Sequence, residues 1–154
     1  MALSERVPTL YALDLIFDAI DAAISEDVFE GRPIRLQKTF SGIEDLEDIQ
    51  SEFFVVIRPD SVESEVNTSE FDEYMVTIVV EVLTACGSVE SMPDQKYRST
   101  LQISQTITDQ IRKRVRKHFV RSDSALIEDE MLDELRLIGV AFTHTLKVLQ
   151  PIPA

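Results

Sequence analysis

The clearest pattern in the chain is a run of alternating side chains at residues 74–84. Every second position carries an aromatic or β-branched residue, which puts these residues on one face of a strand. The positions between them are mostly apolar as well, so we expect a central strand with both faces covered. The residues of the first face, which we expect to point into the core, are Tyr74, Val76, Ile78, Val80 and Val82.

Two other stretches repeat apolar residues at intervals of three and four, which is typical of amphipathic helices. The first covers residues 8–28. Pro8 suits its first turn, and Gly31 with Pro33 closes the segment. The second covers residues 95–120, and cations crowd its last turns, where they complement the helix dipole. We therefore predict two long helices.

Short alternating runs predict three further strands, at residues 34–37, 53–58 and 138–148. Pro59-Asp60 is expected to end the second of these strands. The polar, acidic stretch that follows has no apolar period, so we interpret residues 53–84 as a hairpin with a long projecting tip. Ser122-Asp123-Ser124 predicts a break, and residues 128–135 a short acidic turn or helix.

The predicted order is helix, strand, strand, strand, helix, strand. This order favours a single α+β domain over residues 1–154, a two-layer sandwich of a mostly antiparallel four-stranded sheet with both helices on one face. The expected core consists of Leu13, Phe17, Ile20, Val55, Ile57, Val76, Ile78, Val80, Leu101, Ile111, Val115, Val140 and Phe142.

Charge and cysteine content restrict the classes of function. The chain has 28 acidic and 15 basic residues and a net charge of -13, which disfavours tight binding of nucleic acid. Because Cys86 is the single cysteine, the chain cannot form an internal disulfide or a zinc site built from cysteines. Acidic residues interrupt the N-terminal apolar positions, so we expect no signal peptide, no membrane span and a soluble, cytoplasmic protein.

The sequence carries no recognisable catalytic motif. Its only histidines are His118, near the basic helix end, and His144, in a core-facing position of the last predicted strand. Neither has the partners that nucleophilic catalysis needs, so we expect a structural His144 and no enzyme activity. The acidic clusters at residues 44–48 and 128–130 lack the spacing of a calcium loop. We expect no metal and no cofactor.

A cluster of cations lies at the end of the second predicted helix and just beyond it. Three interpretations remain open: an anion-binding patch, a solvated helix end, or a surface that meets an acidic loop of an adjacent identical subunit. The third suits a strongly acidic protein, because opposite charges on one subunit are what a head-to-tail ring needs. The residues are Arg112, Lys113, Arg114, Arg116, Lys117 and Arg121.

In the order of its elements the whole chain resembles the tail terminator family of long-tailed bacteriophages, the lambda-type tail-completion proteins. Head-tail stopper proteins of the neck share much of this pattern and are an alternative. A small regulatory or ligand-binding domain outside any virion is a third. The resemblance is carried by the helix at residues 10–24, Arg32-Pro33-Ile34 before the first strand, the strand at 74–84, the helix from Tyr97, and the closing Gly139-Val140-Ala141-Phe142.

The resemblance implies a hexameric ring that caps the head-proximal end of the tail tube, stops its polymerisation and joins the neck. Tube protein, a neck protein and further copies of the chain would be its partners, in a virion assembled in the host cytoplasm. DNA would pass the bore without specific binding, and an acidic lining suits that passage. The acidic residues expected to line the bore or contact tube or neck, on the hairpin tip or the connector at 43–51, are Glu44, Asp45, Glu47, Asp48, Glu63, Glu65, Glu70, Asp72 and Glu73.

Overall fold

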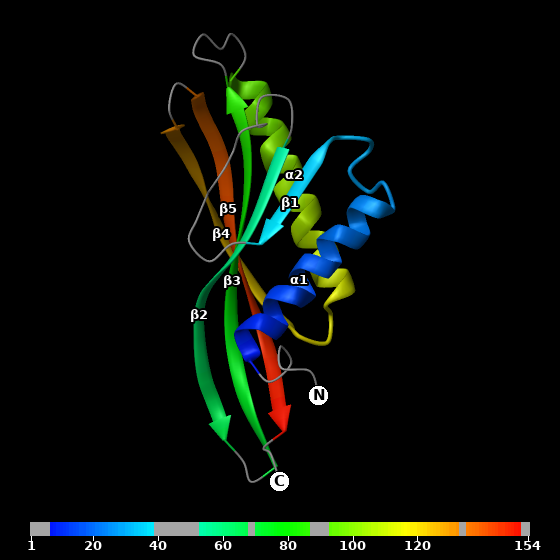
Figure 1. Cartoon of the computed structure of the whole chain (residues 1–154), viewed down its shortest axis with the longest axis vertical. Coiled ribbons are helices and arrows are strands. Elements are labelled where there is room, and N and C mark those ends of the chain that lie inside the picture. Colours follow the sequence, from blue (N-terminus) through cyan, green and yellow to red (C-terminus); the bar gives the residue numbers. More distant parts are fainter. Residues whose placement is uncertain (1–6, 39–52, 68–69, 87–92, 133–134, 152–154) are drawn as a thin grey trace.

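The computed structural model describes residues 7–38, 53–67, 70–86, 93–132 and 135–151. Two helices and five strands follow one another along these residues (Figure 1). The elements are α1 (Pro8–Ser25), β1 (Ile34–Lys38), β2 (Phe53–Asn67), β3 (Phe71–Cys86), α2 (Pro93–Arg114), β4 (Phe119–Leu132) and β5 (Leu135–Pro151).

The strands form one sheet in the order β1-β2-β3-β5-β4, with β3 in the centre as predicted. Strand β1 runs parallel to β2, and the three other neighbouring pairs are antiparallel. The predicted α+β class with two helices is confirmed, but the sheet is mixed and has five strands, not four. The sequence missed β4 and the parallel pairing of β1.

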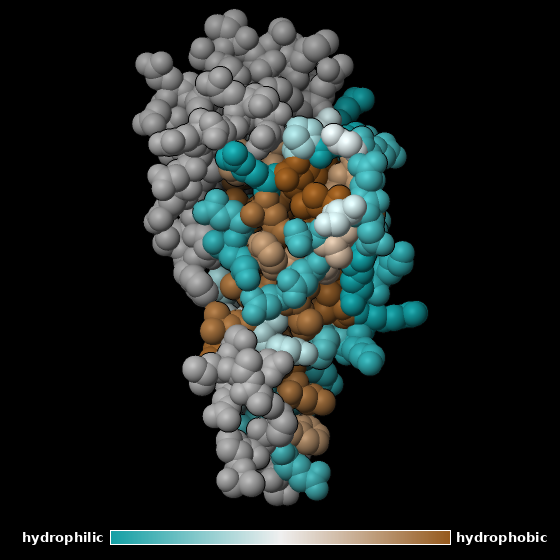
Figure 2. Space-filling view, turned by 45° about the vertical axis from the view of Figure 1, so that its right-hand side comes forward, coloured by the Kyte–Doolittle hydropathy of each residue, from teal (hydrophilic) through white to brown (hydrophobic). Residues whose placement is uncertain are grey.

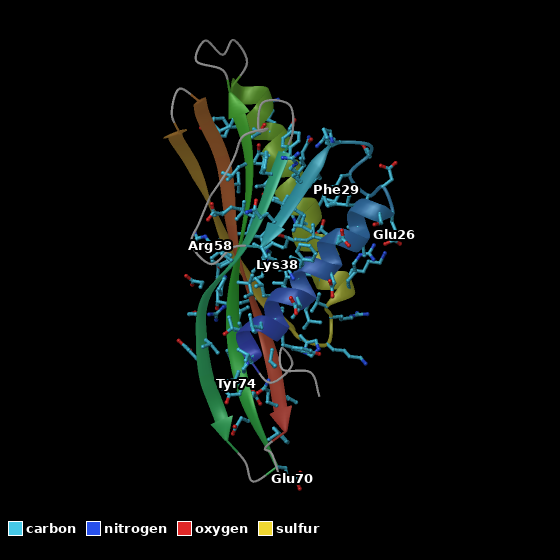
Figure 3. The ribbon with its side chains drawn as sticks, in the orientation of Figure 1. Glu26, Phe29, Lys38, Arg58, Glu70 and Tyr74 are labelled. Carbon is cyan, nitrogen blue, oxygen red and sulfur yellow. The ribbon has the colours of Figure 1, made fainter. Side chains whose placement is uncertain are left out.

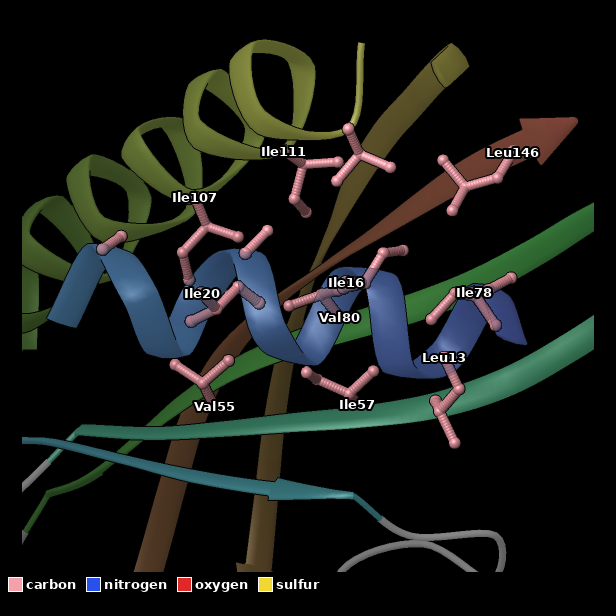
Figure 4. Packing of buried hydrophobic residues seen from close by; sticks show 14 of the residues in the cluster. Leu13, Ile16, Ile20, Val55, Ile57, Ile78, Val80, Ile107, Ile111 and Leu146 are labelled. Atoms are coloured by element: carbon pink, nitrogen blue, oxygen red, sulfur yellow. The ribbon is translucent and has the colours of Figure 1, made fainter. Parts of the chain in front are cut away.

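Both helices pack against the same face of the sheet, where they share one apolar core (Figure 4). Ile16 and Ile20 of α1 meet side chains from β2, such as Ile57, beneath the helix. Ile78 and Val80 of β3 belong to the same cluster, so the face predicted for the central strand does point into the core. Burial of these large aliphatic side chains supplies most of the folding free energy.

The predicted core is wrong at one helix position. Leu101 is 39% exposed, whereas Ile103, two residues later, is almost fully buried. The buried row of α2 is Ile103, Ile107 and Ile111, at intervals of four, and Leu101 lies on the opposite side of the helix. Two predicted core aromatics, Phe17 and Phe142, are only partly buried.

The region after α2 differs most from the prediction. The helix ends at Arg114, not at residue 120, and the chain reverses in a turn where Val115 O accepts bonds from the N–H groups of His118 and Phe119. The predicted break at 122–124 and residues 128–132 of the predicted acidic turn belong to strand β4 instead, and Leu135 begins β5. The long edge of β5 supplies backbone hydrogen-bond partners along this segment. Two shifts in register interrupt the β4–β5 pairing, and they accommodate the residues of β4 that have a low strand propensity.

Strand β2 also continues beyond its predicted end at Pro59. A proline is tolerated here because β1 pairs with β2 only as far as Ile57, so the missing N–H removes no bond from the ladder on that side. A register shift follows between Pro59 and Ser61. The polar stretch predicted as a loop is therefore strand as far as Asn67, paired with Asp72 of β3.

The lower parts of β2, β3 and β5 extend past both helices as a three-stranded projection (Figure 1). We call the lower part of these strands, which begins in the core under α1 and continues past it, the arm: residues 58–67, 71–79 and 143–151. The predicted projecting hairpin is thus present, but β5 joins it as a third strand, and Glu70 lies at its far end (Figure 3). Two apolar side chains of the arm are unusually exposed, Val62 at 47% and Leu149 at 53%.

Candidate interaction surfaces

Three cations of the predicted basic cluster converge on a hollow at the end of α2. Arg112, Lys113 and Arg116 line it together with Asp109 and Phe119, around a volume of about 640 Å³. The chain reversal after α2 creates this hollow by bringing Phe119 back beside the last helical turn, and the Arg112 guanidinium lies 5.6 Å from the Phe119 ring centroid. We call this surface the basic groove.

The remaining cations of the cluster point elsewhere. Arg114 is bound internally, because its guanidinium bonds Glu26 at the end of α1 and Gln110 one turn earlier in α2. Arg121 lies on β4, 3.5 Å from the Asp123 carboxylate. Lys117 is exposed in the turn. The predicted single patch is therefore a groove of three cations with separately placed neighbours.

The groove cations have no acidic partner in the described part of the chain. Asp109, which also lines the hollow, bonds Gln105 at 3.1 Å. In a protein with net charge -13, carboxylates outnumber cations almost two to one, so three adjacent cations without ion pairs are unusual. Such cations are available to bind an anionic group from another molecule.

The acidic residues predicted to line the bore or to contact tube or neck fall into three groups: exposed residues, residues with a bonding partner, and residues whose side chains are not described. Glu63 is exposed on β2 of the arm, while Asp72 accepts a bond from the Tyr74 hydroxyl and Glu73 pairs with Lys147 at 3.0 Å. Glu70 is exposed at the arm's end (Figure 3). Outside the described residues, or described only in their backbone, are Glu44, Asp45, Glu47, Asp48 and Glu65.

The face of the arm turned away from the helices is polar. One row of directly paired residues crosses it from β2 to β4, and its two threonine hydroxyls lie 3.2 Å apart. A shallow hollow of about 270 Å³ lies over this row. Sequence reasoning missed the surface, because the row exists only once β4 is recognised as a strand. Its members are Ser61, Thr77, Thr145 and Arg121.

An ion pair marks the base of the arm on the same face of the sheet. Arg58 Nε donates to Glu81 Oε1 at 2.6 Å, and only 6% of the Glu81 side chain is exposed, against 36% for Arg58. Figure 3 shows Arg58 where β2 bends into the arm. The sequence gives no sign of this pair, since the two residues meet only through the β2–β3 register.

His144 is fully buried, as its core-facing position predicted. Its Nδ1 lies 2.7 Å from the Ser122 hydroxyl, and its Nε2 has no partner among the described residues. Burial lowers the pKa of this imidazole from 6.5 to about 4, because desolvation disfavours the charged form. No carboxylate among the described residues orients the ring, so the pair lacks the third group of a catalytic triad.

This lowered pKa predicts a specific loss of stability in acid. Between pH 6.5 and about 4 the unfolded chain binds a proton at His144 that the folded protein does not. Stability therefore falls as the pH is lowered through that window, by up to about 3 kcal/mol. Urea unfolding at several pH values should show a flatter profile for His144→Leu than for the wild type.

His118 provides the matched control for this measurement, because it is the only other histidine and lies partly exposed near the surface. His118→Leu should keep the acid-dependent slope of the wild type. An unchanged slope in His144→Leu would show that the acid sensitivity arises elsewhere.

The sequence matches no protein-family model and no curated protein. Within the described ranges, no group of three histidine, cysteine or acidic side chains is placed to hold a metal ion. Neither α1 nor α2, the helices of the described residues, is long and apolar enough to cross a membrane.

Proposed function

We propose that the chain is a structural subunit that assembles into a hexameric ring at the head-proximal end of a phage tail tube. In this role it ends tube polymerisation and offers a surface to the neck of the filled head. The observation that carries the proposal is the basic groove, three cations that form no ion pair with any described residue, in a strongly acidic subunit. A subunit with spatially separated, opposite charges is suited to head-to-tail association.

The arm supports the same proposal. It projects past the helical layer (Figure 1), and its apolar Val62 and Leu149 are 47% and 53% exposed. An element that projects past the helical layer is accessible to neighbouring subunits and to the tube. We assign the arm to contacts within the ring and with the tube.

The acidic surface suits passage of DNA. Figure 2 shows hydrophilic residues along the right-hand side of the view, beside a hydrophobic area at its centre, and the net charge of -13 makes the protein acidic. Carboxylates facing the bore of a ring repel the phosphate backbone, so DNA slides through without specific binding. The proposed partners are therefore tube protein, neck protein and further copies of this chain, in the virion and without a membrane.

The position of the protein in assembly intermediates tests the proposal. Isolated tails and isolated filled heads are purified from a lysate of a phage that encodes the chain, and each is probed with an antibody against it. We expect the protein on tails, at one end of the tube. Its presence on heads alone would indicate the stopper role instead, and its absence from both would contradict a virion function.

A further inference from the structure

The hollow on the side of the arm turned away from the helices is acidic, and we call it the acidic hollow. It has a volume of about 270 Å³ and is lined mainly by polar side chains of four strands. Three carboxylates and one guanidinium give its lining a net charge of -2. These charged residues are Asp60, Glu63, Asp123 and Arg121.

Two of the three carboxylates are free. Asp123 has partners inside the hollow, because the Arg121 guanidinium lies 3.5 Å away and the Thr143 hydroxyl donates to it at 3.4 Å. Asp60 and Glu63 are exposed, and neither forms an ion pair with a described residue. The hydroxyl oxygens of the hollow add further acceptors, so the surface suits the guanidinium or ammonium groups of another molecule.

The basic groove has the matching composition. Its three cations and one carboxylate, Asp109, give a net charge of +2 against the -2 of the hollow. Each surface also has one large apolar side chain, Phe119 in the groove and Met75 in the hollow. A thioether packs favourably against an aromatic ring. The two surfaces are therefore complementary in charge and in apolar content.

The two surfaces lie on opposite sides of the sheet. The groove is on the helix side, since α2 forms one wall and Phe119 packs against the core beneath the helices. The hollow is on the other side. Its Thr77 lies between the core residues Val76 and Ile78 in β3, and neighbouring side chains of a strand point to opposite faces.

The sheet register places the two surfaces at the same height along the strands. Phe119 of the groove pairs with Leu146 of β5. The hollow lies over the adjacent row, in which Thr145 pairs with both Thr77 and Arg121. A single strand position, about 3.4 Å, separates the two rows.

A ring can bring two such surfaces together. Each copy in a cyclic ring is related to the next by rotation, so the same side of every copy faces the same way around the ring. The helix side of one copy can therefore face the opposite side of its neighbour. Rotation about an axis along the strands leaves height unchanged, and surfaces at equal height then meet.

We propose that the basic groove of one copy docks onto the acidic hollow of the next copy. This inference rests on the proposed ring and names its subunit contact. Arg112, Lys113 and Arg116 reach the free carboxylates of the hollow, while Phe119 packs on Met75 of the neighbour. Because the two surfaces differ and lie on opposite sides of the sheet, the contact is heterologous, as a ring requires.

Charge reversal tests the contact. The hollow variant carries Asp60→Lys and Glu63→Lys, and the groove variant carries Arg112→Glu and Arg116→Glu. Each variant alone should self-associate at least about 100-fold more weakly than the wild type, because like charges then face each other. The readout is light scattering after size-exclusion chromatography, with circular dichroism to verify that each variant is folded.

Mixing the two variants separates the contact from general effects of charge. The reversed hollow of one variant complements the reversed groove of the other, and the remaining contact in an alternating ring is wild-type on both sides. An equimolar mixture should therefore restore the hexamer, with equal numbers of the two variants by native mass spectrometry. Failure of the mixture to assemble would overturn the proposed contact.

Disulfide crosslinking tests which side of the sheet makes the contact. With Cys86 replaced by serine, a chain that carries Glu63→Cys and Arg116→Cys should form a ladder of linked subunits on mild oxidation. Val62→Cys with Arg116→Cys is the matched control. Val62 is adjacent to Glu63 but pairs with the core residue Val76, so it lies on the helix side and should give no ladder.

The possible failures have different meanings. A control ladder as strong as that of the test pair would overturn the contact, because the two sides of the sheet would then be equally close to the groove. Intact rings in both charge-reversal variants would also overturn it but would leave the ring in place. A wild type that is monomeric at every concentration would overturn both the contact and the proposed ring.

Discussion

Replacing Arg58 with leucine is expected to lower the free energy of unfolding by about 3–5 kcal/mol, because it leaves the Glu81 carboxylate buried without its partner. Glu81→Leu should cost less. Arg58 is 36% exposed, so its guanidinium can reach solvent once the carboxylate is gone. The measurement is urea denaturation followed by circular dichroism under dilute conditions.

The double variant sharpens this prediction. Arg58→Leu with Glu81→Leu removes both charges and should recover most of the stability lost in Arg58→Leu alone. Lys38→Leu is the matched control, since its ion pair with Asp14 is exposed on both sides and should contribute less than about 1 kcal/mol. Equal losses for Arg58→Leu and Lys38→Leu would contradict a buried, paired Glu81.

Ile103→Ala is expected to destabilise the protein by about 2–5 kcal/mol, because it opens a cavity between α2 and the sheet. Leu101→Ala, in the same turn of the helix, should change stability by only about 0.5 kcal/mol, since Leu101 faces solvent. Both substitutions remove three carbons from a four-carbon side chain, so the difference between the two losses of stability isolates the effect of burial. A similar loss of stability in the two variants would contradict this assignment of the buried side of α2.

Elements with a strong, uninterrupted period were predictable from the sequence. The alternation in β3 and β5 identified most of the residues that face the helices, such as Val76, Ile78 and Leu146, because these residues share one face of the sheet. The three- and four-residue spacing of α1 likewise gave its core-facing residues, and the helix begins at Pro8 as predicted. Burial of one whole face of a helix or strand requires apolar residues at a regular spacing, so the buried face can be predicted from the sequence alone.

Strand β4 was not predictable in the same way. Its Ser122-Asp123-Ser124 segment has the composition of a turn, and only the free edge of β5 makes it a strand. The end predicted for β2 at Pro59 was wrong for a related reason, since a proline ends a strand only where a neighbouring strand needs its N–H group. In both places tertiary pairing outweighs local propensity.

The candidate interaction surfaces were predictable in part. The run of cations after residue 111 was evident, but which of them are free depends on distant residues such as Glu26, which binds Arg114. The match in height between the basic groove and the acidic hollow requires the register of four strands. A run of charges in the sequence thus identifies a candidate interaction surface, but which of its side chains are free to bind another molecule can be determined only from the fold.

The measurement that tests the central claim most directly is native mass spectrometry of the purified wild-type chain over a range of concentrations. A subunit with two complementary, heterologous surfaces should give one closed oligomer, a hexamer, that persists on dilution. A monomer at every concentration, or an open series of dimers, trimers and longer chains with no closed species, would contradict the account.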